Sequence, residues 1–378
     1  MRNVAIIVVI ACGIVPALSA PPDLAAGYMF FSPGIISNLQ CRRMKDTAAG
    51  DFFTAVFRLA NDSKNKKPAA QTMLRIEGHL GSEDARIVND DMLAINAFGL
   101  DHQLNRDNSS REHAERYLLA WARTYLPTGN PIDEEYFLKY AGGYDLVRHS
   151  IDTENKAVIE EFLRLLFETG KAFIAAKKGF IPNGNFDSRH LALSAAIAFC
   201  LDDAVMKRYC ENTYRRLIDH NILPGGTVRE LFPEALSDLH VRRRADEVVP
   251  RGATIDFVQR DAMEYHCASA AGLLTAVLIA RRHRLDWGDM KAANGQTIFD
   301  ALDFTIPYAA GRKTHAEFAR SLAAFDAEHH RGGMFDAARA RQLLAMAAVL
   351  SARYRDFADP SVLPPFERLL YYGFSDAP

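Results

Sequence analysis

Residues 190–201 of the chain read HLALSAAIAFCL, and residues 267–280 read CASAAGLLTAVLIA. Both segments are apolar around the whole circumference of a helix, and helices of this kind are buried on every side. The stretches 155–176 and 203–220 instead combine apolar and charged residues at helical spacing, which is typical of helices with one face in water. Because inner and outer helices alternate along the chain, we predict an all-α fold, an (α/α) toroid or incomplete barrel of helical hairpins.

The predicted outer helix over 155–176 has one apolar face. The residues that we expect on this face are Val158, Phe162, Leu165, Leu166 and Phe173. A further amphipathic helix is predicted over 111–126, where the turn PTGNP ends it. Strand signals are sparse. Two segments rich in Gly, Pro and polar residues, 178–188 and 222–257, lead into the inner helices, and such loops on a rigid scaffold are where functional sites tend to lie.

The composition of the chain excludes some classes of partner. Its 378 residues include 45 basic and 47 acidic side chains, with a net charge of −2. No strong field attracts nucleic acid or an acidic membrane, so we expect no nucleic-acid partner. A chain of this length buries a sizeable core without disulfides. Because no linker rich in Pro and Ser follows residue 23, we predict a single domain over 21–378.

The N-terminal sequence MRNVAIIVVIACGIVPALSA has the layout of a secretory signal peptide, and we assign it to residues 1–20. Its apolar run of about a dozen residues is short for a membrane span, which needs about 20 residues. An uncleaved anchor remains the alternative. We identify no later segment long enough to span a membrane, so we expect no stable membrane insertion after signal removal and a periplasmic or secreted protein.

The cysteines beyond the leader are few and far apart: Cys41, Cys200, Cys210 and Cys267. A disulfide scaffold has more cysteines than this, and a metal cluster needs closer spacing. We therefore predict no metal site and interpret these residues as free thiols, buried for the most part. A single disulfide in an oxidising compartment remains an alternative.

Polar residues open the second inner helix, in the sequence RDAMEYH over 260–266. Asp261 and Glu264 form a D-x-x-E pattern that resembles a capping box, and Ser188 is expected to cap the first inner helix, which we expect to begin near residue 189. Tyr265 and His190 then lie in the first turns of buried helices. The positive ends of both helix dipoles face a shared space, which suits an anion.

Further polar side chains are expected beside this space: Asn183, Asn185, Arg260 and His266. Most of these polar residues also have a purely structural interpretation. Asp261 and Glu264 can be simple caps, and His266 can be a satisfied core residue. Arg260 can form a surface ion pair, the two asparagines can form turns, and Tyr265 can pack with its hydroxyl at the surface.

The strings NFDSRHLALSAAIAFCLDD (185–203) and DFVQRDAMEYHCASAAGLL (256–274) resemble the alginate lyase superfamily of polysaccharide lyases. The resemblance extends to residues 117–133, 141–150 and 295–326, and it covers the chain from about 110 to 350. Members of that family have an (α/α) toroid and cleave uronic-acid polysaccharides by β-elimination, usually without an essential redox cofactor. The resemblance implies the same fold and activity for this chain, with an anionic polysaccharide as substrate and no cofactor.

The resemblance also implies roles for individual residues. In those enzymes the tyrosine of a Tyr-His pair at the N-terminal end of a helix transfers the proton. Asn, His and Arg side chains bind the uronate carboxylate and neutralise its charge. Tyr265 matches the tyrosine, Arg260 is the nearby arginine, and Asn185 lies in the asparagine motif. That motif reads Asn-Asn-His-Ser-Tyr-Trp in the family, whereas this chain holds Phe186 at the histidine position. His190 is the candidate substitute.

The chemistry of a uronate fits these residue types. The hydrogen on C5 is weakly acidic because the adjacent carboxylate is negative, so elimination requires that charge to be neutralised. Asn185, with Arg260 or His190, would do this. Tyr265 would act as base and then as acid, provided that a cation lowers its pKa from about 10.

Other residues and other functions remain open. A second group of substrate contacts is predicted at Tyr144, Arg148 and His149. A glycoside hydrolase on the same scaffold would need a carboxylate pair, for which Asp187 and Asp261 are the candidates. A non-catalytic polysaccharide-binding protein is the third alternative.

Overall fold

The computed structural model describes residues 29–78, 81–176, 181–233, 241–329, 332–357 and 359–374. The predicted signal peptide, residues 1–20, lies outside the described residues. The described residues are mainly helical, as predicted, and the strands among them form two short antiparallel ribbons. One ribbon pairs β1 (Gly226–Thr227) with β2 (Val248–Val249), and the other pairs β3 (Ala316–Glu317) with β4 (Gly333–Met334).

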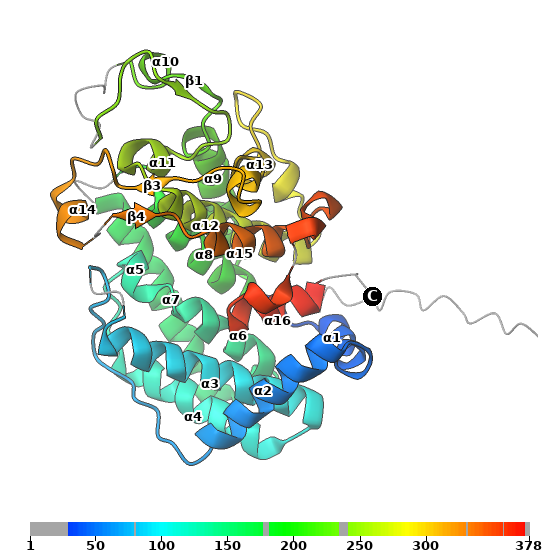
Figure 1. Cartoon of the computed structure of the whole chain (residues 1–378). Coiled ribbons are helices and arrows are strands. Elements are labelled where there is room, and N and C mark those ends of the chain that lie inside the picture. Colours follow the sequence, from blue (N-terminus) through cyan, green and yellow to red (C-terminus); the bar gives the residue numbers. More distant parts are fainter. Residues whose placement is uncertain are drawn as a thin grey trace, which may run out of the picture.

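A ring of inner helices forms the centre of the molecule (Figure 1). Its members in chain order are α3 (Glu83–Asn105), α6 (Phe137–Val147), α8 (Asn185–Cys200), α12 (Met263–Arg282) and α15 (Ala337–Ala347). Each packs against the next, and α16 (Pro365–Phe374) packs against both α15 and α3. The last helix therefore closes the ring between the C-terminal and N-terminal halves.

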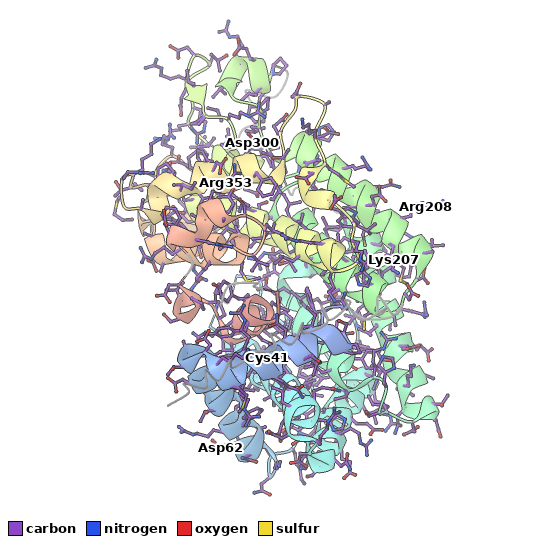
Figure 2. The ribbon with its side chains drawn as sticks, turned by 90° about the vertical axis from the view of Figure 1, so that its right-hand side faces the viewer. Cys41, Asp62, Lys207, Arg208, Asp300 and Arg353 are labelled. Atoms are coloured by element: carbon purple, nitrogen blue, oxygen red, sulfur yellow. The ribbon has the colours of Figure 1, made fainter. Side chains whose placement is uncertain are left out.

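Amphipathic helices cover the inner ring from outside. They are α4 (Asn108–Thr124), α7 (Thr153–Ala176), α9 (Ala204–His220) and α13 (Ile298–Ala309). Each follows an inner helix in the sequence, which is the predicted alternation, and the fold is the predicted (α/α) toroid. Lys207 and Arg208 of α9 lie at the edge of the molecule in Figure 2, as expected for an outer helix.

Shorter elements complete the chain. The remaining α-helices are α1 (Pro33–Lys45), α2 (Thr47–Ser63), α5 (Pro131–Glu134), α10 (Val228–Leu231), α11 (Ile255–Arg260) and α14 (Ala324–His329). The 3-10 helices are η1 (Trp287–Asp289), η2 (Ala352–Phe357) and η3 (Pro360–Val362). The four cysteines among the described residues form no disulfide, with Cys200, Cys210 and Cys267 buried and Cys41 exposed.

The apolar helix α12 corrects one prediction from the sequence. It is long and apolar enough to cross a membrane by length and composition, contrary to our expectation that no later segment is. However, 72% of its apolar window is buried inside the fold. The neighbouring helices, rather than lipid, cover its apolar surface.

The apolar face predicted for α7 is partly wrong. Leu165 is 49% exposed, whereas the buried residues of the helix are Ile159, Phe162, Leu163, Leu166, Phe167 and Gly170. The physical reason is that α7 packs against two helices, α4 and α8. Its buried stripe is therefore broader than a single row and is rotated away from residue 165.

The inner helices α8 and α12 approach each other closely at one glycine. A Cβ atom on Gly272 would lie 2.5 Å from the backbone oxygen of Ser188, a separation that real Cβ atoms do not show. The absence of a side chain at Gly272 lets the third turn of α12 contact the first turn of α8.

We expect Gly272→Ala to destabilise the fold by about 1–3 kcal/mol, because backbone atoms must move to relieve the overlap. Chemical denaturation measures this change. Gly50→Ala in α2 is the matched control, since its Cβ would meet only Arg43 O at 3.4 Å and alanine favours a helix by about 1 kcal/mol. Equal stability of the wild type and the Gly272 variant would contradict the close approach.

Candidate functional site

A cleft of about 460 Å³ lies inside the ring of inner helices. Side chains from α6, α8, α12, α15 and α16 line it. Its apolar lining residues include Leu193, Ala271 and Leu343. Its charged lining residues lie at the N-terminal ends of these five helices, and they are Glu135, Lys139, Arg189, Glu264, Arg339 and Glu367.

The positions of these charged residues show where the cleft opens. They come from the first two turns of their helices, or from just before them. The positive ends of the helix dipoles therefore lie near the same end of the cleft, although carboxylates cap the first N–H groups of α12 and α15. The dipoles favour an anion, while the charged side chains of the lining, three basic and three acidic, balance one another.

The N-terminus of α12 is capped differently from the prediction. Ala262 occupies the N-cap position, and Glu317 of β3 accepts hydrogen bonds from the backbone N–H groups of Met263 (3.0 Å) and Glu264 (3.2 Å). Asp261 ends the preceding helix α11 with a left-handed φ of 53°. The predicted capping box is therefore wrong, because a residue distant in sequence supplies the cap.

The N-terminus of α8 also differs from the prediction. The helix begins at Asn185, and its N-cap Gly184 supplies no side-chain hydrogen bond. Ser188 donates to Asn185 O at 3.0 Å instead of capping the helix. The backbone N–H of Asn185 donates to the buried carboxylate of Asp256.

Tyr265 lies in the first turn of α12, where its hydroxyl contacts Arg260. The hydroxyl is 3.3 Å from Arg260 Nη2, and the guanidinium carbon lies 4.4 Å from the ring centroid. Burial raises the pKa of Tyr265 above 10, and Arg260 opposes that rise without cancelling it. Arg260 acts in the direction that the proposed chemistry requires, but in this structure it does not bring the pKa of Tyr265 below 10.

Arg260 is held in place by a second partner. Its Nε atom donates to Asp326 Oδ2 of α14 at 2.8 Å, and the same two side chains form an ion pair. Asp326 is 2% exposed. The carboxylate therefore orients the guanidinium beside the Tyr265 hydroxyl.

Asn185 and Asn183 lie beside each other in sequence but differ in environment. Asn185 is 5% exposed, and its Nδ2 atom has no hydrogen-bond partner among the described residues. Asn183 has a left-handed φ of 61°, and its Oδ1 atom accepts from Arg216 at 2.5 Å. The geometry of Asn183 is that of a turn former, whereas Asn185 has a buried amide donor that the described residues leave unused.

Two predicted histidines face other parts of the fold. His190 Nε2 is 3.0 Å from the hydroxyl of Tyr209 on α9, and the His190 ring also lies close to Gly170 of α7. It therefore faces the outer helices. His266 is fully buried between Thr254 and Thr305, and burial lowers its pKa to about 4. Its surroundings are those of a neutral core histidine.

The second group of predicted contacts lies at the opposite end of the inner helices. Arg148 donates to the backbone oxygen of Cys200, the last residue of α8. The 16 residues of α8 span about 24 Å, so Arg148 lies far from the helix start. Tyr144 is fully buried with its hydroxyl 2.8 Å from Glu160, and His149 directly follows Arg148. We therefore do not place these residues at the site.

The carboxylate pair of the hydrolase alternative is engaged in ion pairs. Asp187 is paired with Arg216 at 3.1 Å. Asp261 is paired with Arg320 at 2.8 Å, and although burial would raise its pKa, hydrogen bonds and charges, above all those of Arg320, lower it. A general acid needs a raised pKa, so this geometry does not favour the hydrolase.

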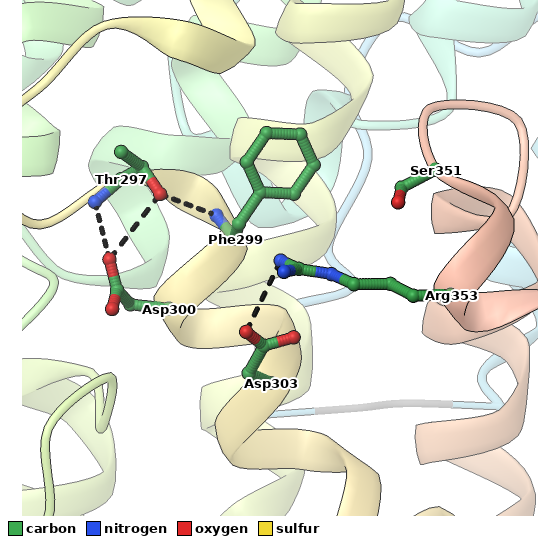
Figure 3. A pocket seen from close by; sticks show the side chains of 6 residues that line it. All are labelled: Thr297, Phe299, Asp300, Asp303, Ser351 and Arg353. Carbon is green, nitrogen blue, oxygen red and sulfur yellow. Dashed lines mark hydrogen bonds and ion pairs between the residues drawn. The ribbon is translucent and has the colours of Figure 1, made fainter.

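A second pocket of about 310 Å³ lies between α13 and η2 (Figure 3). Its charged groups are paired within the protein. Asp300 is bonded to Thr297 and Arg251, and Asp303 pairs with Arg353 at 3.2 Å. We therefore assign the functional site to the cleft inside the ring. Among the described residues, no group of three or more His, Cys, Asp or Glu side chains is placed to hold a metal ion.

Three residues of the site were not assigned from the sequence. Arg189 lines the cleft and interacts electrostatically with Tyr265. Asp256 links the starts of α8 and α12, since Ser269 of α12 donates to it at 2.9 Å. Asp326 orients Arg260 from the short helix α14, which is distant in sequence. Arg189 was detectable as the only cation within 185–200, whereas nothing local in the sequence signals the other two.

Comparisons with known proteins identify relatives of the chain. The family model described as alginate lyase matches residues 59–315. The crystal structure of an alginate lyase from Bacteroides ovatus is similar with a TM-score of 0.58 and 14% identity, over 92% of this chain and 99% of that chain. A variant of alginate lyase A1-III complexed with tetrasaccharide gives a TM-score of 0.51 and 13% identity, over 75% of this chain and 79% of the other. No curated protein matches.

Proposed function

Since the chain belongs to the alginate lyase family, whose members are polysaccharide lyases, we propose that it cleaves a 1,4-linked uronic-acid polymer by β-elimination. The polymer is alginate or a glycan that contains glucuronic acid. The observation that carries the proposal is the contact of Tyr265 with Arg260 at the N-terminal end of α12, where the adjacent residue Glu264 lines the cleft. The signal-like residues 1–20 support a periplasmic or extracellular site of action.

Neutralising the uronate carboxylate is the first requirement of the reaction. Removing the C5 hydrogen places further negative charge next to that carboxylate, so hydrogen-bond donors and cations must offset it. The amide of Asn185 has an unsatisfied donor, and the helix N-termini add partial positive charge. Arg260 is the cation nearest the proton-transfer group. We leave His190 out because its ring faces α9.

Tyr265 transfers the proton in the proposed mechanism. As a phenolate it removes the hydrogen from C5, and as a phenol it then donates that hydrogen to the glycosidic oxygen on C4. The C5–H and C4–O bonds break, a C4–C5 double bond forms, and no external proton is consumed. Because Tyr265 ends in the state in which it began, one residue serves as base and acid.

The test is incubation of the purified protein with alginate, glucuronan and related polymers. A lyase creates an unsaturated sugar, so absorbance in the ultraviolet rises as chains are cut. New reducing ends without this absorbance would instead indicate a hydrolase. Binding without any product after long incubation would indicate a non-catalytic polysaccharide-binding protein, and either of these results would overturn the proposal.

A further inference from the structure

Arg189 occupies a position in the cleft that the proposed mechanism does not use. It lies on α8 one turn after Asn185 and forms part of the cleft wall. It interacts electrostatically with Tyr265 and Glu264 of the facing helix. The Arg189 guanidinium therefore lies in the cleft wall, within electrostatic range of the proposed proton-transfer residue.

The internal partner of Arg189 is also part of the cleft wall. Its Nη1 atom forms an ion pair with Glu135, which lies just before α6. The side chains of Arg189 and Glu135 are 25% and 33% exposed, so a ligand in the cleft reaches both. A substrate carboxylate would compete with Glu135 for the same cation.

The hydrogen bonding of Arg189 is incomplete in this conformation. Its Nε atom is buried and has no hydrogen-bond partner among the described residues. A guanidinium has five donors arranged to bind a carboxylate through two parallel hydrogen bonds. A rearrangement of Arg189 toward a ligand carboxylate in the cleft would satisfy donors that the pairing with Glu135 leaves unused.

We propose that Arg189 binds a carboxylate of the substrate, which replaces Glu135 as the partner of its guanidinium. The cleft would then select free uronates over their esters. This inference rests on the proposed function and names the chemical class of the substrate more closely. Glu135 holds the guanidinium in the free enzyme and is displaced on binding. A methyl ester has no negative charge to compete with Glu135, so it gains little from Arg189.

The test compares the free polymer with its methyl ester in steady-state kinetics. We expect Arg189→Met to raise KM for the free polymer by about tenfold or more, because a charge-assisted hydrogen bond is lost, with a smaller effect on the ester. Glu135→Gln removes the competing carboxylate and should lower KM for the free polymer. A role confined to folding would not improve binding in this way.

Arg164→Met is the matched control, since Arg164 forms an ion pair with Asp203 at 3.1 Å on the outer helix α7. It should leave both KM values unchanged. An Arg189→Met variant with the wild-type KM, or with equal losses on acid and ester, overturns the inference. So does a Glu135→Gln variant whose KM rises.

A second measurement separates this inference from the proposed function. If the wild type cuts no uronate polymer, the proposed function fails, and calorimetry of a short oligouronate with the wild type and Arg189→Met then tests Arg189 alone. Weaker binding by the variant supports a carboxylate-binding role. Equal binding, or no binding to either protein, overturns it.

Discussion

Replacing Tyr265 by Phe is expected to lower kcat on a uronate polymer by about 10²–10⁴-fold, the usual contribution of a positioned acid or base. The substitution removes only the hydroxyl that contacts Arg260. Because the ring keeps its place beside Phe318, the fold and the binding of substrate should change little. The ultraviolet assay measures turnover, and calorimetry with a short oligouronate measures binding.

Tyr144→Phe is the matched control for this substitution. It removes a tyrosine hydroxyl that is bonded to Glu160 at the far end of the inner helices. We expect nearly unchanged kcat and KM, with a modest loss of stability. If the Tyr144 variant lost activity while the Tyr265 variant retained it, the functional site would lie at the other end of the ring.

The inner helices were predictable because apolar residues occupy every face of these helices, which indicates burial on every side. A helix such as α8 or α12 has no water-facing stripe, and this property survives whatever the packing partners are. The orientation of an outer helix is less determined. In α7, the exposure of Leu165 depends on which parts of the apolar face pack against α4 and which against α8. The spacing of apolar residues within one helix does not specify this.

The helix caps show a different limit of prediction. Asp261 and Glu264 have the spacing of a capping box, yet the carboxylate that caps α12 belongs to Glu317. Asp261 is instead surrounded by Arg320, Arg243 and His315. Long-range contacts of this kind decide between two chemically equivalent acids, and local spacing has no information about them.

The candidate site was predictable where its residues are close in sequence. The contact of Tyr265 with Arg260 joins residues five apart, at a helix start that the sequence marks with polar groups. Arg189 was harder to assign, because a single cation in a buried helix can equally be a structural ion pair. Its place in the cleft wall became evident only when α6 and α8 were packed together.

Replacing Arg260 by Met is expected to lower activity near pH 8 by about tenfold to hundredfold, because the cation that favours the Tyr265 phenolate is lost. Burial raises the pKa of Tyr265 above 10, and Arg260 opposes that rise. A base acts in its deprotonated form, so kcat/KM of the wild type should increase with pH through the alkaline range. In the variant the pKa rises further, and the same increase should occur at higher pH.

The buried partner of Arg260 determines the control for this experiment. Removing the guanidinium alone breaks a buried ion pair and leaves the Asp326 carboxylate buried without that cation, which costs about 3–5 kcal/mol. The double variant Arg260→Met, Asp326→Asn removes both charges and should recover stability without recovering activity. A wild-type rate that falls as pH rises would show that Tyr265 acts only as an acid, because a phenol loses that role when it is deprotonated, and another residue would then have to remove the C5 hydrogen.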